Sequence, residues 1–182
     1  HCPALAHAAD SAATPQVRNV ATIAGNLLQR PRCWYYRNET FDCLKKGGHQ
    51  CFAVDGENAY HAIFGDGPCY IVHPSNVAPV LDVCRGDVHV VGGRDPRTIA
   101  ARDLYHLPAD GLRSEHNLGK TEVVRSIELD AAPRSGFHSI KHKQSFDWPL
   151  VFAVATLELD GGRIERARVC AGAVAPIPWR LP

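Results

Sequence analysis

The clearest alternation of hydrophobic and polar positions lies near the C-terminal end of the chain. Residues 154–174 form two alternating runs joined by Gly161-Gly162, and a glycine pair between two such runs predicts a β-hairpin. Shorter runs predict strands over residues 87–91, 122–129 and 137–143. The pattern therefore predicts antiparallel pairing in the second half of the chain.

Helical signals are shorter and are interspersed with these runs. Residues 4–13 are rich in alanine and predict a helix that Thr14-Pro15 interrupts. Residues 76–83 predict another helix, and residues 98–104 alternate before a short helix. Residues 148–153 predict the start of a helix capped near Asp147. Mixed with antiparallel strands, these helices place the chain in the α+β class.

Two segments show neither the alternation of a strand nor the repeat of a helix in their hydrophobic positions. Residues 17–28 thread small residues through an apolar stretch, which predicts a tight backbone that another group approaches closely. Residues 30–73 are rich in glycine, cysteine and aromatic residues. A loop of that length within a compact domain is usually functional or cross-linked.

Composition narrows the class of protein. The chain has 182 residues, 45% of them hydrophobic, so we expect a packed core. Net charge is +1 with both signs interspersed, which argues against nucleic-acid binding or a membrane-surface helix. No apolar run approaches the roughly 20 residues of a membrane span. The chain begins at His1 and contains no methionine, so we expect a fragment of a longer polypeptide.

Four of the seven cysteines fall within the long irregular segment, at Cys33, Cys43, Cys51 and Cys69. They are separated by 9, 7 and 17 residues, without the C-x2-C pairs of zinc ribbons. Common ferredoxin motifs also use short gaps, but four thiolates need only converge in space to hold an iron–sulfur cluster. A zinc site remains an alternative interpretation, because the same segment contains His49, His61 and His73.

Disulfides or free thiols remain possible for the four cysteines, whereas Cys2, Cys84 and Cys170 are expected to be packed small residues. Lys45 and Lys46 would offset the negative charge of a cluster.

Five segments together resemble one known family. They are RNVATIAGNLLQRPRCWYY, the pair Cys43-x7-Cys51, HPSN at 73–76, KHKQSFDWPLVFAVA and GAVAPIPWR. The chain resembles the FAD-binding subunit of the molybdenum hydroxylases (the xanthine dehydrogenase and aldehyde oxidoreductase family), in the branch with an extra 4Fe-4S loop. The resemblance runs from about Ala4 to the last residue.

The resemblance implies a division of the chain into two parts. Residues 1–132 would be the second part of a PCMH-type FAD-binding domain, with the iron–sulfur loop at about 30–73. Residues 133–182 would be the truncated start of an antiparallel-sheet subdomain of the CO dehydrogenase flavoprotein type. The family's Gly-Gly-Thr-type diphosphate loop is not in this sequence, so we expect this chain alone to bind FAD poorly.

The resemblance also implies the site residues. The segment against FAD would be Ala21, Thr22, Ile23, Ala24, Gly25 and Asn26, whose small side chains let backbone amides approach the cofactor. Asn76 stands where most relatives have an aspartate that contacts FAD. Val124 and Lys141 match positions near the flavin. In this branch Cys33, Cys43, Cys51 and Cys69 would ligate the 4Fe-4S cluster.

The implied function is that of an oxidoreductase subunit with no catalytic side chain of its own. A large subunit would carry the molybdenum cofactor, and a small subunit would carry 2Fe-2S clusters that pass electrons to FAD and then to an external acceptor. No nucleic-acid or membrane partner is expected. The expected location is cytoplasmic, or periplasmic within an exported complex. The alternatives are a zinc-stabilised binding module without flavin and a degenerate flavoprotein fragment.

Overall fold

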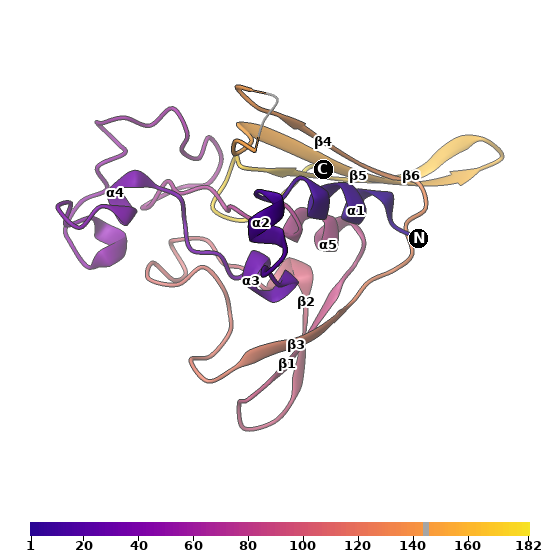
Figure 1. Ribbon diagram of the computed structural model, residues 1–182, viewed down its shortest axis with the longest axis horizontal. Helices are drawn as coiled ribbons and strands as arrows, with labels where there is room; N and C mark the ends of the chain where they lie inside the picture. The colour runs from indigo at the N-terminus through magenta and orange to yellow at the C-terminus, as the bar shows by residue number, and fades with distance from the viewer. Residues whose placement is uncertain (144–145) are drawn as a thin grey trace.

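The structure, a computed structural model, describes residues 1–143 and 146–182. Two antiparallel sheets enclose short helices, and an irregular loop extends to one side of them (Figure 1). The predicted α+β class is therefore confirmed. Within the described ranges, no helix is both long and apolar enough to cross a bilayer.

The larger sheet has the order β4-β5-β6-β7, made by β4 (Ser135–Ile140), β5 (Val151–Asp160), β6 (Arg163–Gly172) and β7 (Trp179–Arg180). Strands β5 and β6 form the predicted hairpin, in which Asp160 pairs with Arg163. Both turn residues have positive φ, 53° at Gly161 and 83° at Gly162. Two consecutive positive φ values match the right-handed twist of a hairpin and favour glycine at both positions.

The smaller sheet has the order β2-β1-β3, made by β1 (Asp87–Val91), β2 (Arg97–Ala100) and β3 (Val123–Glu128). Val88 and Val90 of the central strand are buried, whereas alternate residues face outward. A register shift between His89 and Val90 interrupts the pairing with β3. The strands predicted over 87–91 and 122–129 are thus present.

Helices α1 (Pro3–Asp10) and α5 (Ala78–Val83) lie between the two sheets (Figure 1). Every residue of α5 is buried. Leu81 packs in one apolar cluster with Val88 of the smaller sheet, and Val80 packs in another with Phe152 of the larger sheet. Burial on all sides makes α5 the centre of the core.

The remaining helices are short: α2 (Pro15–Arg18), α3 (Ile23–Leu27), α4 (Trp34–Arg37) and the 3₁₀ turns η1 (Leu44–Lys46) and η2 (Ala101–Asp103). Residues 30–73, which we call the cysteine loop, contain only α4 and η1 as regular helical structure. The expected irregularity of this segment is confirmed. The proposed domain boundary after residue 132 stays a prediction.

Two expected elements differ from the structure. The helix predicted over 148–153 is wrong, because β5 begins at Val151 and pairs with β4 and β6 on either side. Its β-branched and aromatic residues suit a strand between two partners, and this pairing outweighs the capping signal at Asp147. The strand predicted over 137–143 starts earlier and ends at Ile140. Gln144 and Ser145 of the quoted KHKQSFDWPLVFAVA segment lie outside the described residues.

Candidate functional site

A cavity of about 280 Å³ lies beside α2 and α3, and we call it the α3 cavity. Its lining includes five of the residues predicted to contact FAD, namely Ala21, Thr22, Gly25, Asn26 and Asn76. Residues 146–149, which precede β5, also line it. The fold thus brings Asn76 and residues 146–149, which lie about 50 and 120 positions after Gly25 in sequence, to the same cavity as α3.

Short polar contacts fix the shape of this cavity. Thr22 begins α3, where its hydroxyl oxygen accepts a hydrogen bond of 2.9 Å from the Gly25 N–H. The Ser75 hydroxyl donates to Asn26 Oδ1 at 2.7 Å, and Ser75 Oγ accepts from the Ala78 N–H at 2.9 Å. Ser75 therefore binds the first N–H group of α5 and connects this helix to α3.

Polar donors remain for a ligand. Within residues 1–143 and 146–182, no acceptor is found for the hydroxyl proton of Thr22 or for the side-chain N–H groups of Asn26. Asn76 instead donates to Ser11 Oγ at 3.2 Å. The cavity therefore offers two uncommitted donor groups, the Thr22 hydroxyl and the Asn26 amide, and a third polar group that is already engaged.

Four predicted contacts lie elsewhere. Ile23 and Ala24 belong to α3 but do not line the cavity, and the Ile23 side chain is exposed. Val124 pairs with Val90 inside the smaller sheet, and Lys141 follows the end of β4. The structure does not bring Val124 or Lys141 to the α3 cavity.

The sequence analysis missed the contribution of residues 146–149. Phe146 and Trp148 are large aromatic side chains that are 57% and 68% exposed. The guanidinium carbon of Arg32 lies 4.8 Å from the centre of the Trp148 ring, in a cation–π contact. The available sequence signal is an aromatic residue on each side of Asp147, followed by a proline, but the expected helix over 148–153 assigned Trp148 to a helix start instead.

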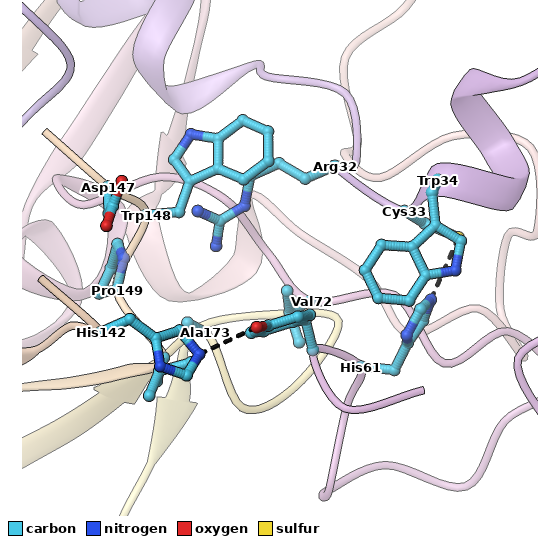
Figure 2. Close-up of a pocket in the computed structure, with 12 residues that line it drawn as sticks. Arg32, Cys33, Trp34, His61, Val72, His142, Asp147, Trp148, Pro149 and Ala173 are labelled. Carbon is cyan, nitrogen blue, oxygen red and sulfur yellow. Dashed lines mark hydrogen bonds between the residues drawn. The ribbon is translucent and has the colours of Figure 1, made fainter. Parts of the chain in front are cut away.

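A second cavity of about 280 Å³ adjoins the first, and we call it the Trp34 cavity (Figure 2). The two cavities share residues 147–149. Figure 2 shows Arg32 and Trp148 on one side, with Trp34 and His61 on the other. Burial lowers the pKa of Arg32 to about 10, so this arginine stays cationic at neutral pH.

The four cysteines of the cysteine loop are connected by three pairwise interactions, of Cys33 with Cys43 and Cys51 and of Cys51 with Cys69. Burial raises the pKa of the Cys33 thiol, and the nearby Cys51 and Cys43 raise it further. A hydrogen bond with Cys69 lowers the pKa of Cys51 to about 5, and the same bond together with burial raises the pKa of Cys69. Among the described residues, no three Cys, His, Asp or Glu side chains gather closely enough to hold a single metal ion.

A buried ion pair anchors the cysteine loop to residues 108–119. Lys45 Nζ lies 2.6 Å from Glu115 Oε1 and donates to the Leu112 carbonyl at 2.8 Å. Both side chains are almost fully buried, and Arg30 Nε lies 3.1 Å from the second Glu115 oxygen. The positive charge of Lys45 also favours the Cys69 thiolate. Lys46, by contrast, donates to the Asn38 carbonyl at the surface.

The three histidines considered as zinc ligands have different surroundings. His61 Nε2 lies 3.2 Å from the Cys33 sulfur. His73 Nδ1 accepts a hydrogen bond from the Ser75 N–H, and burial lowers the pKa of His73 to about 3. His49 is exposed. Of these three histidines, His61 alone contacts a cysteine within the described parts of the chain.

Comparison with known proteins decides the family. The family described as "FAD binding domain in molybdopterin dehydrogenase" matches residues 1–130, and this range contains the five predicted residues that line the α3 cavity. The chain belongs to this family of FAD-binding domains. Among curated proteins, the aldehyde oxidoreductase FAD-binding subunit PaoB of Escherichia coli (strain K12) is 33% identical over 183 residues. That match covers 97% of this chain and 56% of PaoB.

Solved structures support the same fold for this FAD-binding domain. Quinoline 2-oxidoreductase from Pseudomonas putida 86 matches with a TM-score of 0.62 at 19% identity, covering 98% of this chain and 46% of that chain. Carbon monoxide dehydrogenase from Hydrogenophaga pseudoflava matches with a TM-score of 0.62 at 22% identity, covering 98% and 47%. The chain therefore spans about half the length of the relatives that it matches.

Proposed function

We propose that the protein is the FAD-binding, electron-transferring subunit of a molybdenum-containing oxidoreductase. The observation that carries this proposal is the α3 cavity, which combines five predicted FAD contacts within the range of the family match. No side chain of this chain would act as a catalytic residue. When bound, FAD supplies the two-electron chemistry, and the protein binds and orients it.

The residues of the α3 cavity suit part of an FAD molecule. Gly25 places no side chain on the cavity wall, and a Cβ atom added there would make a tight contact of 3.2 Å with Thr22 Oγ1. Thr22 and Asn26 retain donors that would bind cofactor oxygens. The volume of about 280 Å³ lies just below the roughly 300–1,000 Å³ of typical ligand sites. The aromatic Trp34 cavity next to it would extend the site.

The proposed partners are a large subunit with the molybdenum cofactor and a small subunit with 2Fe-2S clusters. The family description and the names of PaoB and carbon monoxide dehydrogenase support a molybdenum-containing complex of several subunits, and the 2Fe-2S small subunit is proposed from the family resemblance. In this proposal, electrons from substrate oxidation at molybdenum reach FAD through iron–sulfur clusters and leave to an external acceptor. The name of PaoB makes aldehydes the substrate class that we propose for the complex.

We also propose that Cys33, Cys43, Cys51 and Cys69 hold a 4Fe-4S cluster. Cys43 and Cys51 raise the pKa of Cys33, and Cys51 and Cys69 shift each other's pKa, yet among the described residues no three such side chains gather around a single ion. This arrangement suits a cluster better than zinc. A cubane cluster spreads its four cysteine ligands around eight inorganic atoms, whereas zinc draws its ligands to about 2.3 Å from one centre. The buried Lys45 would partly offset the charge of the cluster.

A matched pair of glycine substitutions tests FAD binding. Gly25→Leu would fill the α3 cavity, whereas Gly136→Leu adds its side chain on β4, where a Cβ atom meets nothing within 4 Å. FAD is titrated by flavin fluorescence into the longer polypeptide that we expect to contain this chain, which we call the full protein. We expect G25L to raise the Kd about tenfold or more, a cost of roughly 1.4 kcal/mol. We expect G136L to leave the Kd within about twofold of the wild type, well under 1 kcal/mol. Equal affinities for both variants and the wild type would refute this FAD site.

A further inference from the structure

His61 holds a fixed position beside one of the proposed cluster ligands. Its Nε2 atom lies 3.2 Å from the Cys33 sulfur, and the side chain is buried (Figure 2). The imidazole packs edge-on against Trp34, at 5.1 Å between ring centres. The backbone N–H of His61 donates to the Asn58 carbonyl at 2.9 Å. These contacts set the direction of the ring before any metal binds.

The hydrogen-bonding needs of His61 determine its tautomer when Cys33 is a thiolate. A ligating thiolate has no proton and can only accept a hydrogen bond. His61 Nδ1 is buried and has no partner within the described parts of the chain. Because Nδ1 lacks such a partner in either tautomer, the contact with Cys33 decides: an unprotonated Nε2 would direct its lone pair at the thiolate, and the two would repel each other. A proton on Nε2 instead meets the Cys33 sulfur.

We infer that His61 is a positioning residue for the cluster, which donates an Nε2–H hydrogen bond to the Cys33 sulfur and raises the reduction potential of the cluster. The inference rests on the 4Fe-4S cluster proposed above. A donated hydrogen bond withdraws negative charge from the sulfur and so favours the more negative, reduced cluster. Cys33 also lines the Trp34 cavity, so the adjusted ligand faces the proposed flavin site.

Three variants separate this role from packing. His61→Phe keeps an aromatic ring beside Trp34 but removes the donor, and His61→Gln keeps an N–H donor without the ring. His49→Phe changes an exposed histidine of the same loop and is the control. The measurements are iron content and the midpoint potential from an EPR-monitored redox titration of the full protein, purified anaerobically. We expect a more negative potential in H61F, recovery toward the wild-type value in H61Q and no shift in H49F.

A spectroscopic measurement on the wild type tests the hydrogen bond even if a variant fails to fold. In protein labelled with ¹⁵N-histidine, we expect pulsed EPR of the reduced cluster to show weak coupling to one nitrogen, which H49F retains and H61Q loses. Strong coupling, typical of a ligand, would overturn the inference, as would the absence of coupling. An unchanged potential in H61F would also overturn it, as would loss of iron from both His61 variants. Absence of iron and sulfide from the wild type would refute the cluster itself.

Discussion

The core around α5 and the cysteine loop both bury their key side chains, but they do so by different means. In the core, Val80 of α5 is completely buried against Val154 and Cys170 of the larger sheet. In the cysteine loop, burial depends on separate contacts, such as the ion pair of Lys45 with Glu115. The loop also has an aromatic group formed by Tyr35, Phe41 and Phe52.

This difference indicates where stability and function reside. The core is stabilised by contiguous apolar burial, which tolerates the absence of any ligand. The cysteine loop has little regular structure and few anchors, so its order would depend on the bound cluster and on those anchors. Changes to the two regions should therefore give separable results.

The largest effect is expected in the core. Phe152→Ala removes a side chain that is 2% exposed and packs against Phe137, so we expect a loss of about 3–5 kcal/mol in the free energy of unfolding. Phe64→Ala in the cysteine loop is the matched control, because Phe64 is 40% exposed and stacks on Trp179. Its loss should not exceed about 1.5 kcal/mol. Denaturant unfolding of both variants measures the difference, and equal losses would remove the distinction between the two regions.

The next effect concerns the anchor of the cysteine loop. Lys45→Met leaves the buried Glu115 without its closest partner, and breaking a buried pair typically costs about 3–5 kcal/mol. The half-exposed Arg30, which also contacts Glu115, should bring the loss toward the lower end of that range. We expect hydrogen exchange to accelerate across residues 43–69 and to stay slow in β5 and β6.

Two controls make the Lys45 experiment specific. Lys46→Met changes the half-buried neighbour, which donates to the Asn38 carbonyl at the surface, and its exchange should match the wild type. The double variant K45M/E115L removes both charges and should recover part of the lost protection, because no buried charge is left unpaired. Acceleration that spreads equally into β5 and β6 would contradict a separable loop.

A smaller, pH-dependent effect is expected at His73, where the cysteine loop meets the core. Burial lowers its pKa from 6.5 to about 3, so the unfolded chain takes up this proton before the folded chain does. Stability from the neutral His73 is therefore present above pH 6.5 and is lost as pH falls toward 3, by up to about 1.4 kcal/mol per pH unit.

The variant His73→Asn tests this assignment, because asparagine keeps an acceptor for the Ser75 N–H but does not titrate. Between pH 6.5 and pH 4, the free energy of unfolding of H73N should fall less steeply than that of the wild type. His49→Asn, at an exposed position, should keep the wild-type slope. A wild-type slope in H73N would show that another group causes the acid sensitivity.

The smallest effect is expected at the start of α3. Thr22→Ala removes the cap that accepts from the Gly25 N–H, at a cost of about 1 kcal/mol. Thr14→Ala removes the equivalent cap of α2 and should cost a similar amount. Only T22A should also weaken FAD binding, because Thr22 lines the α3 cavity and Thr14 does not. Titration with FAD distinguishes the two caps, and equal affinities would argue against a ligand contact by Thr22.

Local sequence signals predicted those parts of the structure that depend on neighbouring residues. The alternation around Gly161-Gly162 specifies a hairpin, and the small residues around Gly25 belong to a cavity wall. The start of β5 was missed because Val151 becomes a strand residue only through partners on both sides. No local pattern reveals that Glu115 meets Lys45 or that His61 meets Cys33, since each pair lies far apart in sequence.

The most direct test measures iron, acid-labile sulfide, zinc and flavin in the full protein, purified anaerobically, for the wild type and Cys51→Ser. A FAD-binding subunit with a cluster in its cysteine loop predicts FAD together with about four iron and four sulfide per chain in the wild type. It also predicts loss of iron and sulfide, with the core still folded, in C51S. Zinc without sulfide would contradict the cluster, and absence of flavin from the wild type would contradict the central claim.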